Sequence, residues 1–215
     1  MKAIVLGATG LVGNLILKDI FKDKDFSEVR IFVRRSTGLI NPKLKEIVNP
    51  MGDIDSLSSE ILGDVIFNAL GTTIKQAGSQ EEQQRIDRDL PIAFARLASE
   101  NGVRIMLNIS SVGANIKGGF YLKTKAEMEN GTEKFFPGKV FHFRPGFLVG
   151  KRKDFRLVEK IAFGIMRAID PVLSGSYKKY RSMPADKLAK AMVSLSKNHV
   201  GKPAVLHYTE IMQCI

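Results

Sequence analysis

The chain has 215 residues, of which 44% are hydrophobic and 26% charged, a composition that excludes a disordered or collagen-like protein. Its length suits one domain with a sizeable core. The formal net charge is +11, and residues 151–215 alone hold 13 basic and 5 acidic side chains.

Several other classes of protein are disfavoured. A single cysteine, Cys214, cannot form an internal disulfide, which argues against secretion. His142, His199 and His207 are scattered without ligand spacing, so we expect no metal site. No apolar run approaches the ~20 residues that span a bilayer, and the first strand leaves no room for a signal peptide. These observations predict a cytoplasmic protein.

Short apolar runs alternate with helical patterns over the first 150 residues. The expected strands are Ala3–Leu6, Val29–Val33, Lys45–Val48, Asp64–Leu70, Arg104–Ser110 and Lys139–Arg144. The expected helices are Leu11–Phe21, Glu81–Asn101 and Phe120–Lys134. Within the second helix, Pro91 either introduces a kink or starts the main part. This alternation predicts an α/β, doubly wound Rossmann fold, with a mainly parallel sheet and helices on both faces.

The pattern changes after Gly150. We expect helices over Phe155–Ile169 and Ala185–Lys197 and a last strand over Pro203–Tyr208. Because about 65 residues are few for a separate domain, we interpret residues 1–215 as a single domain. Residues 151–215 would form a short C-terminal cap, packed on the edge of the sheet and closing the substrate side.

Three glycines with the spacing G-x-x-G-x-x-G follow the first strand. Gly7 would allow a tight turn, Gly10 would let the backbone approach a pyrophosphate, and Gly13 would let the helix pack closely on the sheet. The helix N-terminus offers free N–H groups to phosphates. In the first strand–helix turn, this pattern favours nucleotide binding over a glycine-rich connection that binds nothing.

The second strand is followed by Arg34 and Arg35, and no acidic residue occurs between positions 29 and 45. NAD-binding folds usually place Asp or Glu there. Two guanidinium groups would suit the 2′-phosphate of NADP, although arginines at a strand end can also be simply solvated. We therefore expect NADP(H), with NAD(H) as the alternative. Asp53, after the third strand, either accepts a hydrogen bond from the adenine amino group or caps a helix.

A serine pair and a Tyr-x-x-x-Lys sequence follow the fifth strand. Tyr121 and Lys125 are four residues apart and share a helix face. A nearby ammonium would favour the phenolate, so that Tyr121 could exchange a proton with a carbonyl oxygen. Ser110 or Ser111 could hold the same oxygen, and a dinucleotide would supply the hydride. Alternatively, Tyr121 is only a half-buried helix residue.

Together these motifs resemble the short-chain dehydrogenase/reductase family, and the glycine spacing is that of its extended and atypical branches. Further segments are similar to one atypical branch, the Tat-interacting-protein-like oxidoreductases. These segments are Leu70-Gly71-Thr72-Thr73, Gln76-Ala77-Gly78-Ser79, Asp87-Arg88-Asp89, Ser110-Ser111-Val112-Gly113-Ala114 and Phe143-Arg144-Pro145-Gly146-Phe147-Leu148. The likeness runs from Met1 to about Arg156.

The resemblance implies an NADP(H)-binding site built from several segments. The glycine-rich turn would bind the pyrophosphate through Gly7, Thr9, Gly10, Leu11, Val12 and Gly13, and Arg34 and Arg35 would bind the 2′-phosphate. Leu70 and Gly71 would lie near the ribose. Tyr121 and Lys125 would lie beside the nicotinamide ribose, and Leu148 near the nicotinamide. Arg152 and Arg156 would complete the site. The family pattern assigns catalysis to Ser111, Tyr121 and Lys125. Asp87 departs from the wider family, in which many members carry Asn, and this puts a water-mediated proton relay in doubt.

The basic C-terminal region has two interpretations. A membrane-surface or anion-binding element would use the helix around Phe155–Ile169 and the segment Tyr177-Lys178-Lys179-Tyr180-Arg181. We favour the simpler interpretation of a core-packing helix and a solvated loop. Nucleic-acid binding is not expected, since the chain has no recognised module for it.

The sequence therefore predicts an NADP(H)-dependent oxidoreductase that acts on a carbonyl or alcohol. The expected substrate is a small molecule, and the positive charge of the C-terminal region favours an anionic one. The competing hypothesis is a regulatory protein whose bound NADP(H) sets its affinity for a partner. Sugar-nucleotide epimerisation is a third option, but it needs a larger C-terminal substrate region.

Overall fold

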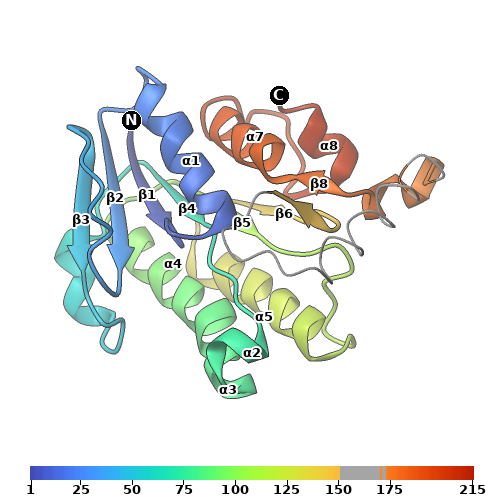
Figure 1. Ribbon diagram of the computed structural model, residues 1–215, viewed down its shortest axis with the longest axis horizontal. Helices are drawn as coiled ribbons and strands as arrows, with labels where there is room; N and C mark the ends of the chain where they lie inside the picture. The colour runs from blue at the N-terminus through green and yellow to red at the C-terminus, as the bar shows by residue number, and fades with distance from the viewer. Residues whose placement is uncertain (151–169, 171–172) are drawn as a thin grey trace.

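The computed structural model describes residues 1–150, 170 and 173–215, and its centre is a parallel β-sheet. In this part of the chain the sheet has seven strands in the order β3-β2-β1-β4-β5-β6-β9 (Figure 1). The strands are β1 (Lys2–Leu6), β2 (Glu28–Val33), β3 (Leu44–Val48), β4 (Val65–Asn68), β5 (Ile105–Ile109), β6 (Lys139–Phe143) and β9 (Val205–Leu206). The chain moves outward from β1 in both directions, as in doubly wound folds. The expected Rossmann fold is confirmed, and each strand lies within two residues of its predicted bounds.

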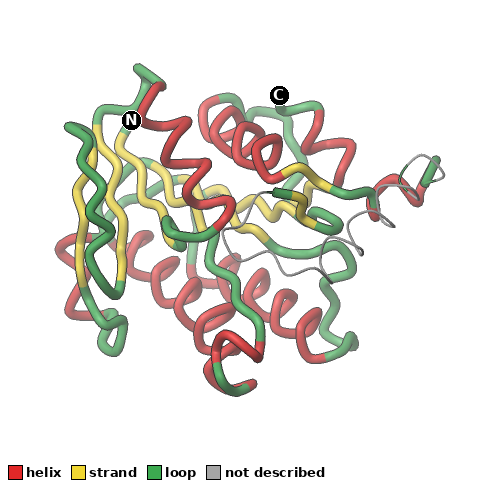
Figure 2. The backbone as a smooth tube through the Cα atoms, viewed as in Figure 1, coloured by secondary structure: helices red, strands yellow, loops and turns green. Residues whose placement is uncertain are grey.

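Helices cover both faces of the sheet (Figure 2). One layer holds α1 (Leu11–Lys22), α7 (Ala185–Lys197) and α8 (Tyr208–Met212), and the other holds α4 (Leu90–Glu100) and α5 (Phe120–Phe135). Shorter elements are η1 (Asp55–Glu60), α2 (Ile74–Ala77) and α3 (Gln80–Gln84). None of the helices in the described residues is long and apolar enough to cross a membrane.

The two layers explain why β1 is apolar from Ala3 to Leu6. Ala3 and Val5 pack into the cluster formed with α1 and α7, whereas Ile4 and Leu6 pack into the cluster formed with α4. Successive side chains of a strand point to opposite faces, so a strand covered on both sides is mainly apolar along its length.

The C-terminal residues do more than lie on the edge of the sheet. Helix α7 packs beside α1 in the main core, and β9 pairs with β6 as the outermost parallel strand. Two further strands of two residues each pair in parallel as a separate small sheet. They are β7 (Leu148–Val149), which follows β6, and β8 (Met183–Pro184), which directly precedes α7. A 3₁₀ helix, η3 (Gly175–Tyr180), precedes β8. The helix expected over Phe155–Ile169 lies outside the described residues.

The helix expected over Glu81–Asn101 is interrupted rather than kinked. Helix α3 continues into a π-helical turn, η2 (Arg85–Asp89), and then into α4. Pro91 has no N–H to donate to the carbonyl of Asp87, the usual acceptor four residues earlier. The N–H of Leu90 instead bonds to Arg85 O, five residues back. Pro91 therefore lies in the first turn of the main helix, which is one of the two interpretations of the sequence. The turn before it is a π turn, which holds one residue more than an ordinary α-helical turn.

The turn from β1 into α1 depends on glycines. Gly7 has a φ of 73°, and a Cβ built on it would lie 2.5 Å from Ala69 O in the neighbouring strand connection. A Cβ on Gly13 would overlap the carbonyl oxygen of Gly7 and lie 2.7 Å from its carbonyl carbon. Because both neighbours are backbone, they cannot move aside as a flexible side chain would.

We expect Gly13→Ala to destabilise the protein by about 2 kcal/mol or more, since the added methyl group must push α1 away from the turn. Urea unfolding followed by circular dichroism measures this. The control is Gly52→Ala, where a Cβ meets nothing within 4 Å and the change should stay within about 0.5 kcal/mol. Equal stabilities of the two variants would show that the close approach is not required.

Candidate functional site

The N-terminus of α1 faces the carboxyl edge of the sheet with its amides uncapped. Gly10 is the N-cap residue and provides no side-chain hydrogen bond to the first turn. Its own N–H donates to Gly7 O over 2.9 Å, which closes the turn. Thr9 and Gly10 are exposed, and Leu11 is partly so. This is the geometry in which a helix N-terminus binds a phosphate group.

The loop after β2 is held by a residue that the sequence interpretation missed. The Glu46 carboxylate on β3 accepts hydrogen bonds from Ser36 Oγ (2.7 Å), from the N–H of Thr37 (3.0 Å) and from Thr37 Oγ1. These bonds lower the pKa of Glu46, chiefly those from the side chains of Thr37 and then Ser36. The guanidinium groups of Arg34 and Arg35 remain exposed beside this loop. The only sequence signal for Glu46 was its place directly after the long stretch without acidic residues.

Asp53 acts as a capping residue. Its Oδ1 accepts hydrogen bonds from the N–H groups of Asp55 (3.1 Å) and Ser56 (3.3 Å) at the start of η1. These contacts agree with one of the two interpretations of Asp53, that its side chain caps the start of a helix. A contact of Asp53 with adenine stays a prediction.

The serine pair lies where β5 ends, and its two members differ in exposure. Ser110 is 4% exposed, and its hydroxyl has no hydrogen-bond partner among the described residues. Ser111 is more accessible, and its Oγ donates to Val112 O over 3.3 Å. The N–H of Val112 donates to Pro145 O over 2.9 Å, so this loop is tied to the segment that follows β6.

Tyr121 and Lys125 lie one helical turn apart at the start of α5, with very different surroundings. Tyr121 is 43% exposed, whereas Lys125 is 3% exposed. The ammonium of Lys125 reaches back to the end of β5, where Nζ lies 3.5 Å from Ile109 O, two residues before Ser111. The N–H of Asn115 donates to Leu122 O, which closes the serine loop onto the first turn of α5. The expected catalytic residues are thus brought to one edge of the sheet.

The loop after β4 completes this edge. A Cβ built on Gly71 would lie 3.9 Å from Lys125 Nζ, and the N–H of Leu70 donates to Asn68 Oδ1 over 3.2 Å. The N–H of Thr72 donates to Asp87 Oδ1 over 2.8 Å. Gly71, expected near the ribose together with Leu70, therefore lies beside the buried ammonium.

The segment after β6 returns to the N-terminus of α1. A Cβ built on Gly150 would lie 2.8 Å from Leu11 Cδ1. Leu148, two residues earlier, pairs with Met183 in the small sheet. The segment that carries Leu148 thus runs close to the first turn of α1, and a contact of Leu148 with the nicotinamide stays a prediction. Arg152 and Arg156 lie outside the described residues.

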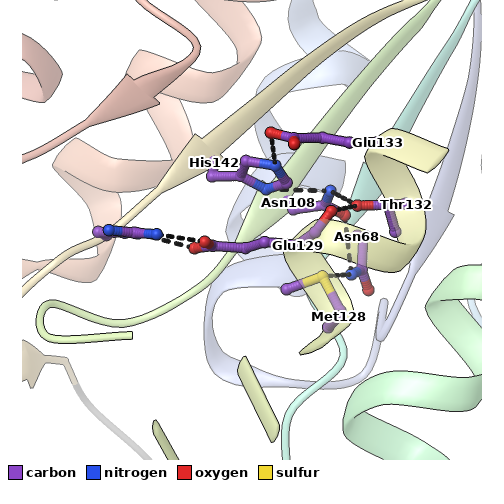
Figure 3. Close-up of polar contacts among 8 residues, drawn as sticks. Asn68, Asn108, Met128, Glu129, Thr132, Glu133 and His142 are labelled. Carbon is purple, nitrogen blue, oxygen red and sulfur yellow. Dashed lines mark hydrogen bonds and ion pairs between the residues drawn. The ribbon is translucent and has the colours of Figure 1, made fainter. Parts of the chain in front are cut away.

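A buried polar network beneath the site was not foreseen (Figure 3). Asn68, Asn108 and His142 occupy matching positions on β4, β5 and β6. Asn68 Nδ2 donates to Asn108 Oδ1 (3.0 Å), and Asn108 Nδ2 lies 3.4 Å from His142 Nδ1. His142 Nε2 lies 3.0 Å from Glu133 Oε1 on α5. Polar residues at equal depth in three apolar strands were the signal that could have revealed it.

The same network extends to α5 through two further contacts. Asn108 Nδ2 also donates to Thr132 Oγ1 (3.1 Å), and Arg144 forms a two-point ion pair with Glu129. A neutral imidazole with its proton on Nε2 satisfies both contacts of His142. Because Asn68 Oδ1 also holds the N–H of Leu70, the network fixes the strand ends that carry the site.

Comparison with known proteins places the chain in a family. "Protein FMP52, mitochondrial" of Eremothecium gossypii is 36% identical over 154 residues, which cover 71% of this chain and 69% of that protein. The chain belongs to the FMP52 family. The Saccharomyces cerevisiae member is 31% identical over 216 residues, covering 95% of this chain and 91% of its own. No family model matches the chain.

Solved structures show the same fold at low identity. The Bordetella bronchiseptica enzyme WbmH in complex with NAD+ superposes with a TM-score of 0.72 at 14% identity, covering 96% of this chain and 75% of that one. The human epimerase family protein SDR39U1 with NADPH gives 0.66 at 14% identity, with 96% and 73% covered. The chain therefore shares the Rossmann fold of these dinucleotide-bound proteins. The narrower resemblance to Tat-interacting-protein-like oxidoreductases stays a prediction.

The expected location of the protein has to be corrected. The relatives of Eremothecium gossypii, Candida albicans and Saccharomyces cerevisiae are all named mitochondrial, which contradicts the prediction of a cytoplasmic protein. That prediction rested on a single cysteine and on the lack of a signal peptide or an apolar span. None of these features separates the cytosol from other compartments that keep thiols reduced.

Acid should weaken the folded state through His142. Burial lowers its pKa below the ordinary value of 6.5, although Glu129 and Glu133 act in the opposite direction. The unfolded chain then takes up this proton at a higher pH than the folded one, so this contribution to stability is lost as the pH falls below about 6.5. We expect the free energy of unfolding to fall less between pH 7 and 5.5 in His142→Asn than in the unaltered protein. Urea titrations at several pH values measure this, and identical slopes would contradict it.

Proposed function

We propose that this protein is an NADP(H)-dependent oxidoreductase that reduces a carbonyl or oxidises an alcohol, with Ser111, Tyr121 and Lys125 as the reacting set. The observation that carries the proposal is the buried ammonium of Lys125 at the carboxyl ends of β4 and β5. Ligands of open α/β sheets bind beyond these strand ends. A buried charge placed there, one turn from an accessible phenol, suits the chemistry of this fold better than a structural role alone.

The described residues fit a nicotinamide dinucleotide. The uncapped first turn of α1 would hold the pyrophosphate through the amides near Gly10, Leu11 and Val12. Thr9 lies in the same exposed turn. The ammonium of Lys125 has donors left for ribose hydroxyls, since its acceptor among the described residues, Ile109 O, lies 3.5 Å away. Arg34 and Arg35 are exposed and would pair with the 2′-phosphate. Glu46 holds the loop that follows them through Ser36 and Thr37.

The chain's own groups would supply proton transfer and positioning. When bound, the nicotinamide ring supplies or accepts the hydride. The Tyr121 hydroxyl would give its proton to the carbonyl oxygen during reduction and take it back during oxidation. Ser111 Oγ would donate a hydrogen bond to the same oxygen and fix its position. Lys125 would hold the ribose hydroxyls through its ammonium.

The names of the relatives support a mitochondrial setting for this activity. We propose that the substrate is a small molecule. The cap expected over residues 151–215 lies in part outside the described residues. Of the described ones, residues 173–184 would close the nicotinamide side, and their basic side chains, Lys178, Lys179 and Arg181, would favour an anionic substrate. Hydrogen exchange with and without NADPH and candidate substrates tests this, and an unchanged exchange rate over residues 173–184 would show that they do not form the lid.

We expect Tyr121→Phe to retain NADPH binding and to lose about 10²–10⁴-fold in turnover, the usual contribution of a general acid–base group. The measurement is NADPH oxidation with a carbonyl substrate found by screening, together with calorimetric titration of the cofactor. The matched control is Tyr177→Phe, a tyrosine that is 65% exposed on η3. Turnover of Tyr121→Phe at the unaltered rate would remove Tyr121 from the mechanism and favour a regulatory binding protein.

We expect NADPH to bind more tightly than NADH. Losing one charge-assisted contact with the 2′-phosphate should cost roughly 1.5–3 kcal/mol. In Arg34→Ala/Arg35→Ala the preference should disappear, whereas Lys75→Ala, an exposed cation on α2, should keep it. Calorimetric titrations with NADPH and NADH measure the two affinities. Equal affinities in the unaltered protein would contradict the proposed preference for NADP(H).

A further inference from the structure

Asp87 places a buried carboxylate against the candidate site. The side chain is fully buried, and its Oδ1 accepts the 2.8 Å hydrogen bond from the N–H of Thr72. Its Oδ2 has no hydrogen-bond partner among the described residues. That oxygen lies 3.8 Å from Lys125 Nζ, so the two groups form a buried ion pair without a hydrogen bond. An unbonded buried carboxylate oxygen is costly unless a nearby charge compensates it.

Lys125 has the complementary requirement. Its ammonium is as buried as the carboxylate, and its only hydrogen bond in the described part of the chain is the long one to Ile109 O. A buried ammonium needs a counter-charge as well as hydrogen-bond acceptors. Asp87 is the one ion-pair partner that the described residues provide for it.

The other charged groups on the packed elements are occupied with one another. Arg85 pairs with Glu82 on α3, and Arg88 pairs with Asp89 and with Glu127 on α5. Lys123 lies 3.8 Å from Glu127 on the exposed side of α5. These pairs are all partly exposed, so they contribute little charge to the interior. Asp87 and Lys125 therefore face each other as a pair.

The wide turn at η2 is what brings Asp87 to this position. Pro91 cannot bond to the carbonyl of Asp87, and the N–H of Leu90 reaches Arg85 O instead. Single π turns of this kind insert one residue into a helix and redirect side chains, often at functional sites. Here the inserted turn carries the carboxylate between α5 and the loop after β4.

We propose that Asp87 is the counter-ion of Lys125 and the residue that positions its ammonium under the loop of Leu70–Thr72. One oxygen of Asp87 accepts the hydrogen bond from Thr72 in the loop, and the other faces the ammonium of Lys125. The same carboxylate therefore sets the distance between the loop and the ammonium. The ammonium is then kept in place before a ligand arrives and retains free N–H donors. Asp87 acts through Lys125 and is a positioning residue. The role of this arrangement in binding the nicotinamide ribose rests on the proposed function, whereas the pairing itself does not.

The first test is a stability cycle that needs no ligand. Lys125→Met leaves a buried carboxylate without a counter-charge, and Asp87→Asn leaves a buried ammonium without one, while the amide still accepts the bond from Thr72. Each single variant should therefore unfold at lower urea than the unaltered protein, and the double variant should be more stable than either single one. If the losses of the single variants simply add in the double variant, the counter-ion role is overturned.

The second test follows the carboxyl group directly by carbon NMR. Burial raises the pKa of Asp87, and the positive charge of Lys125 opposes this. Lys125→Met should raise the pKa of Asp87 by about one unit or more, with the signal assigned from its loss in Asp87→Asn. Lys123→Met, on the exposed side of the same helix, is the control and should leave the pKa unchanged. An equal response to the two lysine variants would contradict the pairing.

The third test asks whether the pair serves the cofactor. Calorimetric titration should show that Asp87→Asn binds NADPH about tenfold more weakly, the equivalent of one charge-assisted hydrogen bond. Binding of 2′,5′-ADP, which lacks the nicotinamide ribose, should not change. An equal effect on both probes would overturn the positioning role. If the unaltered protein binds neither probe, the proposed function fails, and the first two tests still decide the pairing.

Discussion

The ammonium of Lys125 is the group around which the rest of the site is arranged. A charge that is almost completely buried has to be compensated, and solvent cannot do this at the end of β5. The compensation comes from the Asp87 carboxylate at 3.8 Å and from a backbone carbonyl at 3.5 Å. Neither contact is a strong hydrogen bond, so the ammonium keeps donors for a ligand that arrives from the open edge of the sheet.

The fold supplies this arrangement through elements that are far apart in sequence. The glycine turn fixes α1 against the sheet, so its N-terminus faces the same edge as the ends of β4 and β5. The network of Asn68, Asn108 and His142 links the ends of β4, β5 and β6 to one another (Figure 3). The wide helical turn before Pro91 adds the carboxylate. A rigid scaffold therefore holds the buried charge, while Tyr121 stays accessible at the surface.

The sequence predicted the parts of this structure that depend on local pattern. The strands are mostly apolar and alternate with helical patterns, so the fold class and the approximate bounds of the strands could be derived. The two-residue strands β7 and β8 carry too little pattern to be seen. Tyr121, Lys125 and the serine pair were identified by spacing and by resemblance, and the structure brings them to one edge. The burial of Asp87 could not be predicted, because it depends on how the wide turn η2 packs against α5 and the loop after β4.

Other misses have the same origin. Glu46 reaches the loop after β2 from the neighbouring strand, and strand pairing cannot be read from the spacing of charges along one segment. The location was predicted wrongly because features that argue against secretion do not distinguish the cytosol from mitochondria. A wide groove at the opposite, amino edge of the sheet, lined by residues such as Arg104, Lys139 and His199, was also not foreseen. Its position away from the strand ends that bind ligands in this fold separates it from the candidate site.

A crystal structure of the protein with NADP+ would show whether Lys125 binds the nicotinamide ribose. We expect the pyrophosphate at the N-terminus of α1 and the nicotinamide ribose within hydrogen-bond distance of Lys125 Nζ, with Asp87 still beside the ammonium. A dinucleotide bound elsewhere, for example in the groove at the amino edge of the sheet, would contradict this expectation. So would a bound cofactor whose ribose leaves Lys125 untouched.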